Sequence, residues 1–508
     1  MIHNKEAKEV IKKAVNIAVD AVKETFGVFG NTVIIPSTFN HVVTKDGVSV
    51  LSAINSEDEY ENIVIDILKE SALRTNKEVG DGSTTFSVLT QALYNSAITH
   101  IENGAKPIDV KRGMEKAVQL VLNELDGMST KVTNTKELKS VATISSNNDL
   151  ELGELIGELF DKIGVGGVTS IEASPNNKTY TDVIQGMSYD KGWMGSVFAN
   201  NKSKMLAEYT DVNILITDSE ISSHLEIIPA LSYVLQTGNK PLLIICDDID
   251  YNTQSTILDN INQLGMKVVI TKAPYFSQKR YDFLEDIAIY TGATLFSKDR
   301  DMVLENFTPE DLGQAEKIIC SKDQTLIVKK NDNPELEERA KGIEETDDYS
   351  KARLANLRGK LGVVYVGADT DVEYKERYDR IEDALNATRA SLEEGFLIGG
   401  GNALLKISKT LKSKTSKNED ERLGMESVFK AIQQPFKTIL ENAQQESQHP
   451  INLVLATKDV RKGYSVTEGE VKDLIEMGII DPVKVTKHAL RNASSVVAQL
   501  LTTNVIIK

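Results

Sequence analysis

Residues 241–296 read PLLIICDDIDYNTQSTILDNINQLGMKVVITKAPYFSQKRYDFLEDIAIYTGATLF. Short apolar runs at 241–249, 266–274 and 293–297 alternate with two longer stretches, 257–265 and 281–292, that carry helical patterns. Because a strand–helix–strand alternation is typical of parallel sheets, this segment predicts an α/β unit that forms a domain in its own right.

The sequence on both sides of this segment is mostly helical. Residues 5–25 place apolar side chains on one helical face, and helical patterns dominate from 58 to 160. A short strand at 361–367 leads into further helical patterns, and the chain closes with the strand-like TTNVIIK (502–508). We therefore expect an α+β multidomain protein in which an α/β domain is inserted into a discontinuous helical domain.

Three smaller segments also give predictions. The runs TVIIP (32–36), HVVT (41–44) and VSVL (48–51) read as short strands separated by turns. The segment 331–360 is heavily charged and predicts a solvated helical hairpin. The helix after Asp81 is expected to end at Asn103–Gly104.

Composition excludes several classes of protein. The net charge is -17, and no long basic run occurs, which argues against a nucleic-acid partner. Cys246 and Cys320 lie far apart at the ends of apolar runs, so buried free thiols are expected, and the six histidines show no metal-ligand spacing. The sequence contains no apolar run of about 18 residues and starts without an apolar signal segment, so the expected location is the cytoplasm.

The strongest local motif is Gly80-Asp81-Gly82-Ser83-Thr84-Thr85, which opens an apolar helix. Glycines allow close approach of the backbone, and free N–H groups of a first helical turn bind anions. Asp81 could hold Mg²⁺ together with phosphate oxygens, or it could simply cap the helix. The chain contains no GxxxxGK[ST], so a nucleotide would have to bind by another arrangement than a P-loop.

Three weaker candidates have ordinary structural explanations as well. Gly399-Gly400-Gly401 precedes a helix and could approach a ribose or phosphate, or could be a flexible joint. Thr44-Lys45-Asp46-Gly47 could belong to the same site or be a plain hairpin turn. Asp383, in the helical segment IEDALNATRA, would ordinarily be a solvated surface residue.

Taken together, eight segments in order resemble group I chaperonins, the GroEL family, over about residues 5–505. They are VTKDGVSV, VGDGSTT, VATISSNND, KPLLII, EDLGQA, IEDALNATRASLEEG, IGGGNALL and MGIIDPVKVTKHAL. The resemblance implies an equatorial ATP-binding domain (1–127 and 394–508), an intermediate hinge domain (128–184 and 362–393) and an apical domain that binds unfolded protein (185–361). It also implies a homo-oligomeric, seven-fold ring and an ATPase that uses Mg²⁺ and K⁺.

The same resemblance assigns roles to individual residues. Asp383 matches the catalytic aspartate and Asp46 acts beside it, while Asp81 matches the residue that holds Mg²⁺. The implied nucleotide-binding residues are Thr25, Phe26, Gly27, Val28, Lys45, Asp81, Gly82, Ser83, Thr84, Thr85, Ser145, Gly400, Ser465, Val466, Thr467 and Asp481. The family's proline after Gly27 is replaced by Val28, and its adenine-contacting Asn-Ala-Ala aligns with 465–467, which here is Ser-Val-Thr.

Apolar apical residues are implied to hold unfolded client proteins. The matching positions are Trp193, Val197, Phe198, Ile228, Leu231, Val234 and Leu258, although such residues could also be core. Gln254 and Asp259 are polar where the family is apolar, which predicts altered docking of a co-chaperonin or none. The divergent segment 443–462 leaves a single or a double ring open, and such divergence would suit a phage-encoded copy.

Other classes of protein remain as alternatives. A metabolic kinase would need an acceptor-binding constellation, and the sequence offers no candidate for one. A group II chaperonin shares the glycine–aspartate–glycine motif, but TKDGVSV and DPVKVTKHAL favour group I. A scaffold without hydrolysis is disfavoured by the presence of Asp46, Asp81 and Asp383.

Overall fold

The protein consists of two compact units. The computed structural model describes residues 1–36, 41–146, 149–164, 167–175, 177–202, 205–329, 334–344, 347–357 and 359–508. Unit 1 comprises residues 1–161, 171–181 and 365–508, and unit 2 comprises residues 162–170 and 182–364. Unit 1 is therefore discontinuous in sequence. The division into equatorial, intermediate and apical domains is finer than these two units and stays a prediction.

Unit 1 is built from helices around one large apolar core and smaller apolar clusters. Its longer helices are α1 (Asn4–Lys23), α3 (Glu59–Val79), α4 (Ser83–Glu102), α5 (Pro107–Met128), α13 (Asp371–Glu394) and α18 (Val483–Thr502). The shorter ones are α2 (Gly47–Ala53), α6 (Thr135–Ser145), α7 (Leu150–Ile163), α14 (Asn402–Thr410), α15 (Glu419–Ala431), α16 (Gln434–Asn442) and α17 (Gln448–Ala456). The predicted helices at 5–25 and after Asp81 are confirmed, and α5 begins at Pro107.

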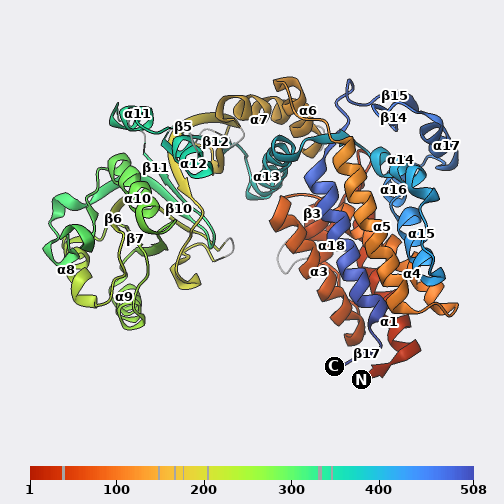
Figure 1. Cartoon of the computed structure of the whole chain (residues 1–508), viewed down its shortest axis with the longest axis horizontal. Coiled ribbons are helices and arrows are strands. Elements are labelled where there is room, and N and C mark those ends of the chain that lie inside the picture. The colour runs from red at the N-terminus through yellow and green to blue at the C-terminus, as the bar shows by residue number, and fades with distance from the viewer. Residues whose placement is uncertain are drawn as a thin grey trace. The chain divides into compact units, whose positions relative to one another are not determined.

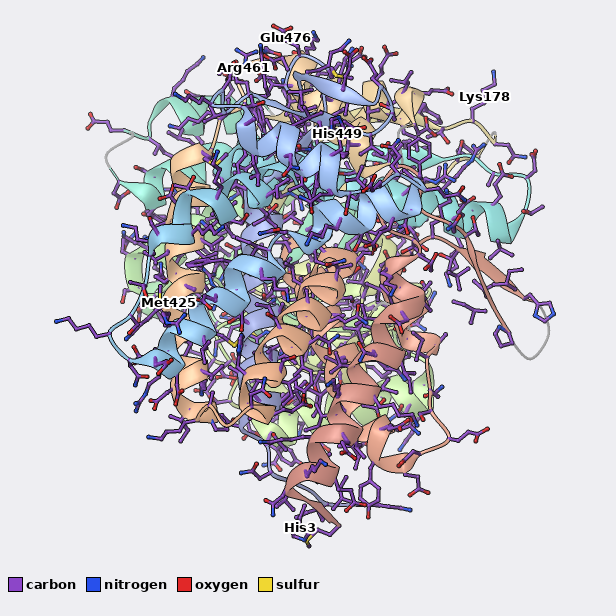
Figure 2. The ribbon with its side chains drawn as sticks, turned by 90° about the vertical axis from the view of Figure 1, so that its right-hand side faces the viewer. His3, Lys178, Met425, His449, Arg461 and Glu476 are labelled. Atoms are coloured by element: carbon purple, nitrogen blue, oxygen red, sulfur yellow. The ribbon has the colours of Figure 1, made fainter. Side chains whose placement is uncertain are left out.

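Four small antiparallel strand pairs complete unit 1. They are β1–β17 (Ile2–His3 with Val505–Ile506), β2–β3 (Val33–Ile35 with Val42–Thr44), β13–β16 (Phe396–Ile398 with Ile480–Pro482) and β14–β15 (Lys462–Ser465 with Glu470–Asp473). The two chain ends meet in the first of these pairs, and β14–β15 lies at the opposite end of the helices (Figure 1). Figure 2 shows the same separation, with His3 at one end of unit 1 and Arg461 and Glu476 at the other.

The predicted strand VSVL (48–51) is wrong, because these residues lie in helix α2. Val50 and Leu51 are both 2% exposed, whereas adjacent residues of a strand would point to opposite faces. The side chain of Asp46 caps this helix by accepting hydrogen bonds from the N–H groups of Val48 (3.1 Å) and Ser49 (2.8 Å). The turn at 44–47 therefore joins a strand to a helix and is not a hairpin.

A nine-stranded sheet with helices against it lies mostly in unit 2. The path is β4 (Val168–Ala173), β12 (Lys360–Val366), β5 (Tyr180–Tyr189), β11 (Thr325–Val328), β10 (Gly313–Cys320), β6 (Ala207–Thr217), β7 (Leu242–Cys246) and β8 (Val268–Lys272), with β9 (Leu295–Phe296) on β6. The predicted parallel strands β7, β8 and β9 are confirmed: β7 and β9 pair with β6, and β8 pairs with β7. The antiparallel strands β5, β10 and β11 were not predicted.

Three helices follow the parallel strands of unit 2. They are α8 (His224–Gln236) after β6, α9 (Tyr251–Leu264) after β7 and α10 (Ser277–Thr291) after β8. The core beneath them includes the strand residues Leu242–Cys246, all fully buried. Cys246 and Cys320 are buried free thiols, as the sequence predicts. In the part of the chain that the structure describes, no helix is both long enough and apolar enough to cross a bilayer.

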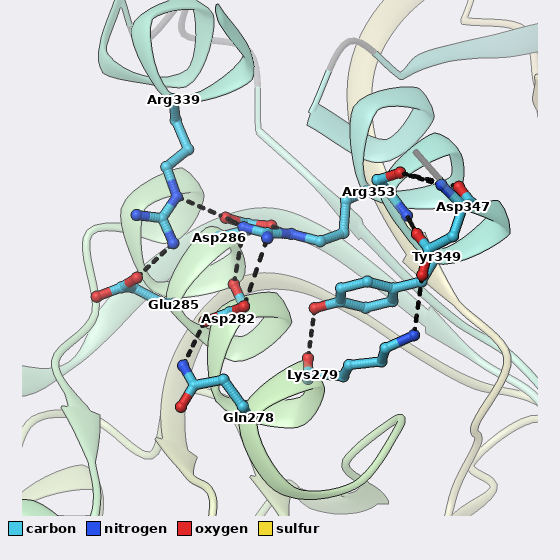
Figure 3. A network of polar contacts seen from close by, with 10 residues as sticks. Gln278, Lys279, Asp282, Glu285, Asp286, Arg339, Asp347, Tyr349 and Arg353 are labelled. Atoms are coloured by element: carbon cyan, nitrogen blue, oxygen red, sulfur yellow. Dashed lines mark hydrogen bonds and ion pairs between the residues drawn. The ribbon is translucent and has the colours of Figure 1, made fainter. Parts of the chain in front are cut away.

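The charged segment 331–360 forms helices, but it is anchored by buried ion pairs and is not simply solvated. Residues 331–333, 345–346 and 358 lie outside the described part. Most of the others form α11 (Pro334–Lys341) and α12 (Asp348–Leu357). Figure 3 shows Asp286 of α10 between Arg339 of α11 and Arg353 of α12.

Asp286 is fully buried and accepts several charge-assisted hydrogen bonds. Arg353 donates to both carboxylate oxygens (Nε 2.7 Å and Nη2 2.8 Å), and Arg339 Nε donates at 2.9 Å. The arginines also pair with Asp282 and Glu285 on the same helix. The ion pairs thereby fix both charged helices to α10.

We predict that Asp286→Ala destabilises unit 2 by about 3–5 kcal/mol, because two arginines lose their shared buried partner. The measurement is urea unfolding followed by the fluorescence of Trp193, the single tryptophan of the chain and a residue of unit 2. Glu337→Ala, at an exposed carboxylate of α11, is the matched control and should shift stability by less than about 0.5 kcal/mol. Equal stability of the two variants would contradict the role given to Asp286.

Candidate functional site

The motif at 80–85 forms a tight junction between helices α3 and α4. Gly80 ends α3 and Gly82 precedes α4, both in the left-handed region (φ 71° and 90°) that favours glycine. Gly82 has no side chain to cap the helix, so the N–H groups of the first turn, which includes Ser83, Thr84 and Thr85, point to an open helix end. This end of α4 has the character of an anion site.

Asp81 lies between the two glycines, next to the Asp46 turn. A methyl group at Gly47 would lie 2.2 Å from the Thr84 hydroxyl oxygen and 3.4 Å from that of Ser83, so the two loops pack directly together. Asp81 is half-buried. Burial, the largest effect, and the Asp46 carboxylate raise the pKa of Asp81 to about 6, against a hydrogen bond from the Gly82 N–H that lowers it.

Asp383, on helix α13, lies near Asp81 and Asp46. The helix is capped by Thr370, whose side chain accepts from the Glu373 N–H at 3.2 Å, and it packs against α6 and the end of α3. Asp383 is half-buried and is not the solvated surface residue that its segment alone would suggest. Burial, followed by the carboxylates of Asp81 and Asp46, raises the pKa of Asp383 well above its ordinary value.

Asp481 is a fourth carboxylate, held by the glycine loop that follows β13. It pairs with Leu397 across β13–β16, and the N–H groups of Gly400 and Gly401 donate hydrogen bonds to it. Burial, the largest effect, and the Asp81 carboxylate raise the pKa of Asp481 to about 6, although those two hydrogen bonds lower it. Gly400 and Gly401 have φ of 64° and 72°, so this turn requires glycine.

Four aspartates from four separate segments thus come together. Neighbouring carboxylates raise the pKa values of Asp81, Asp383 and Asp481. Such a cluster is suited to a cation, because a positive charge would relieve the repulsion. Within the described ranges, however, no three histidine, cysteine or acidic side chains form a metal cage of their own. A divalent ion here would need oxygen ligands from water or a bound anion, as Mg²⁺ commonly does.

Sequence reasoning missed Asn402, which joins the glycine loop to the β14–β15 hairpin. The side chain is 1% exposed, and its amide donates to the carbonyl oxygens of Gly399 (2.9 Å) and Tyr464 (3.3 Å). Its carbonyl accepts from the Tyr464 N–H at 2.9 Å. This bridge places Ser465, Val466 and Thr467 beside the glycine loop. An Asn directly after three glycines was the available signal.

The predicted base-contacting residues are partly occupied by contacts within the protein. The Ser465 and Thr467 hydroxyls lie 3.0 Å apart and share a hydrogen bond, and the Val466 carbonyl accepts from Gln445 Nε2 at 2.9 Å. Val466 is buried in an apolar cluster against which Phe26 also packs. Two predicted segments far apart in sequence, 25–28 and 465–467, therefore share one small core.

The turn at 25–28 is held by Asn442 of α16. Asn442 donates to the carbonyl oxygens of Lys23 (2.9 Å) and Phe26 (2.8 Å). The Thr25 hydroxyl donates to the Val22 carbonyl at 2.8 Å, and Val28 is 45% exposed. Gly27 has φ 83°, and a methyl group there would lie 2.9 Å from Ile439.

Two predicted nucleotide-binding residues are not joined to the carboxylates by direct contacts. Lys45 is exposed beside Asp46, and Ser145 is half-buried at the last position of α6. Among the described residues, we find no hydrogen bond or ion pair from either side chain to the four aspartates. Their predicted roles stay predictions.

The predicted client-binding residues of unit 2 divide into exposed and buried sets. Val197 and Ile228 are 45% and 42% exposed. Phe198, Leu231 and Val234 are buried core residues, while Trp193 and Leu258 are partly buried against the same core. The structure therefore offers only part of this set to a partner, and the client-binding role of the set is a prediction.

A groove between α8 and α9 presents further apolar side chains. It is lined by His224, Ile227, Ile228, Leu231, Ser232, Leu235, Thr256, Ile257, Asn260 and Met266. Leu225, Leu235, Tyr251 and Leu264 on these helices are 41–80% exposed, and sequence reasoning did not select them. On α8, the helical spacing of Leu225 and Leu235 from the selected Ile228 could have identified these two leucines.

Gln254 does more than replace an apolar surface residue. Its side-chain amide donates to the Met194 carbonyl at 2.8 Å, which ties α9 to the segment that carries Trp193. Asp259 on the same helix is exposed.

The fold and the sequence together identify a chaperonin. The model of the TCP-1/cpn60 chaperonin family matches residues 19–274 and 244–508, and the chain belongs to this family. The structure is similar to that of chaperonin gp146 from the bacteriophage EL 2 (Pseudomonas aeruginosa), crystallised in the presence of ATP-BeFx. For crystal form II the TM-score is 0.73 at 24% sequence identity, covering 99% of this chain and 98% of that one. For crystal form I it is 0.66 at 23% identity with the same coverage. The resemblance to chaperonins and the predicted GroEL-like fold are thereby confirmed.

We predict that Asn402→Ala loosens the hairpin at 462–473 without unfolding unit 1, because backbone groups at Gly399 and Tyr464 lose their buried partner. Amide hydrogen exchange of a peptide spanning 462–468 should accelerate by at least about tenfold, the equivalent of a lost buried hydrogen bond. Asn452→Ala, at an exposed asparagine of α17, should leave this exchange unchanged. Unaltered exchange in Asn402→Ala would show that the bridge contributes nothing.

Proposed function

We propose that this chain is an ATP-hydrolysing chaperonin subunit that acts in a homo-oligomeric, seven-fold ring. It binds non-native polypeptides through apolar residues of unit 2 and promotes their folding by ATP-driven domain movements. The observation that carries the proposal is the convergence of Asp46, Asp81, Asp383 and Asp481 around the open end of α4.

The nucleotide would bind across loops that come from both ends of the chain. The first-turn N–H groups of α4 and the hydroxyls of Ser83, Thr84 and Thr85 would hold phosphate oxygens. Gly400 and Asp481 would hold the ribose, and the turn at 25–28 together with 465–467 would line the base. The ATP-BeFx used with gp146 supports nucleotide binding in this fold.

The cluster fits Mg²⁺, which Asp81 would hold together with phosphate oxygens, and K⁺ beside Lys45 and Asp46. When bound, Mg²⁺ neutralises charge on the phosphates and so favours attack at phosphorus. In the chain itself, the Gly82 N–H fixes the Asp81 carboxylate, and Asp46 is fixed by its two bonds to α2. Both acidic groups are therefore oriented before a ligand arrives.

Asp383 would orient the attacking water and accept its proton. A raised pKa suits a general base, because the proton it takes is then held more firmly. The residue lies on α13, within the predicted hinge domain. If that domain moves, hydrolysis must wait until α13 brings Asp383 to the phosphates.

Client proteins would bind to exposed apolar side chains of α8 and α9. Hydrophobic burial is non-directional, so a patch of this kind tolerates many sequences. Polar Gln254 and Asp259 on α9 reduce the apolar surface available there, which supports altered docking of a co-chaperonin or none. The similarity to a phage chaperonin favours a phage-encoded protein that acts in the bacterial cytoplasm.

We predict that Asp383→Ala keeps ATP binding but lowers turnover by ~10²-fold or more, since the water loses its orienting base. Phosphate release at saturating ATP measures turnover, and calorimetric titration measures binding. Lys375→Ala, at an exposed residue of the same helix, should retain near-normal turnover. Near-normal hydrolysis in Asp383→Ala would refute the assignment.

We also predict that Ile228→Ser weakens the capture of a chemically denatured test protein at least about threefold, because each exposed apolar side chain contributes burial in every subunit of a ring. Suppression of light scattering during dilution of the denatured protein measures capture. Met302→Ser is the matched control, since Met302 is similarly exposed (40%) but does not line the groove. Equal loss of capture in both variants would argue against the α8–α9 surface.

A further inference from the structure

Helix α13 contacts the junction between α3 and α4 through one face. Asp383, Asn386 and Ala390 follow one another at spacings of three and four residues, which places them on the same side of the helix. Ala390 forms a small buried apolar cluster with Val79 at the end of α3 and Val485 of α18. The face that carries Asp383 is therefore also the face that packs against the α3–α4 junction.

Asn386 on this face lies directly against the backbone of Gly80. A methyl group at Gly80 would lie 2.1 Å from the Asn386 side-chain nitrogen and 2.2 Å from its Cβ, distances that no real pair of atoms adopts. The α13 backbone can thus come this near only because position 80 has no side chain. Arg389, one turn further along α13, donates a hydrogen bond from Nη1 to the side-chain oxygen Oδ1 of Asn386 at 3.4 Å, which restricts the orientation of the side-chain amide.

The glycines of the motif have different neighbours. A methyl group at Gly82 would meet Val485 Cγ1 at 2.7 Å, so Gly82 is packed by α18, whereas Gly80 is packed by α13. The helix that carries Asp383 is therefore in steric contact with the residue immediately before Asp81.

We propose that Asn386 is a positioning residue whose contact with Gly80 sets how closely Asp383 approaches Asp81. The inference rests on the proposed ATPase function and adds that a steric contact limits how far α13 can approach the α3–α4 junction. Asn386 does not touch the reacting atoms in this proposal. It acts by fixing the approach of α13, so a change at either contact partner should alter turnover and leave nucleotide binding nearly intact.

The test measures kcat and ATP affinity separately in the full-length protein. Gly80→Ala should lower kcat by about 10²-fold, the cost of misplacing a reacting group by roughly 1 Å, with the Kd for ATP changed less than about threefold. Gly265→Ala controls for backbone strain. Gly265 also ends a helix in the left-handed region (φ 65°), but nothing lies within 4 Å of a methyl group there, so kcat should be unchanged.

A double-mutant cycle identifies the partner. In the Asn386→Gly background, which removes the clashing Cβ, Gly80→Ala should lower kcat by no more than about threefold. Asn386→Gln lengthens the side chain, leaves Gly80 intact and should also lower kcat without loss of ATP affinity. Equal effects of Gly80→Ala in both backgrounds, or normal kcat in Asn386→Gln, would overturn the inference. A wild-type protein that hydrolyses no ATP would instead refute the proposed function itself.

Discussion

The repulsion among half-buried carboxylates that lie close together is the constraint on which the site depends. Asp81, Asp383 and Asp481 all have raised pKa values because they are withdrawn from water and face one another. Bringing such groups together costs free energy, and the fold has to supply it through helix packing, capping and glycine turns. Asp46 and Asp481 are each held by two backbone N–H groups, which reduces this cost without removing the negative charge.

In unit 2, by contrast, the charge of a buried aspartate is compensated by neighbouring arginines. Asp286 is fully buried, yet Arg339 and Arg353 surround it, so its charge is matched within the protein. The matched group anchors two helices and has no capacity left for a ligand. The unmatched carboxylates of unit 1 retain that capacity, which is why they form the candidate site and Asp286 does not.

Close backbone packing connects the site to the rest of unit 1. Gly47, Gly80, Gly82 and Gly399 each lie where an added methyl group would meet a neighbouring segment. These contacts leave little freedom in the relative placement of α2, α4, α13 and β16. A movement of α13 would therefore change the surroundings of Asp81 directly, and a chemical step there can depend on the position of that helix.

The sequence by itself determined that the N- and C-terminal parts of the chain are mostly helical, where the parallel strands β7–β9 lie, and that the motif at 80–85 opens a helix. It could do so because periodicity, glycine and capping residues act locally. The resemblance over eight ordered segments also brought Asp46, Asp81, Asp383 and Asp481 into one hypothesis. Only the tertiary structure decided that VSVL is helical, that Asp286 anchors the charged helices and that Leu231 and Val234 are core. It alone brought Asn386 to Gly80 and Asn402 to Tyr464. Each of these depends on contacts between segments far apart in sequence, which no local pattern contains.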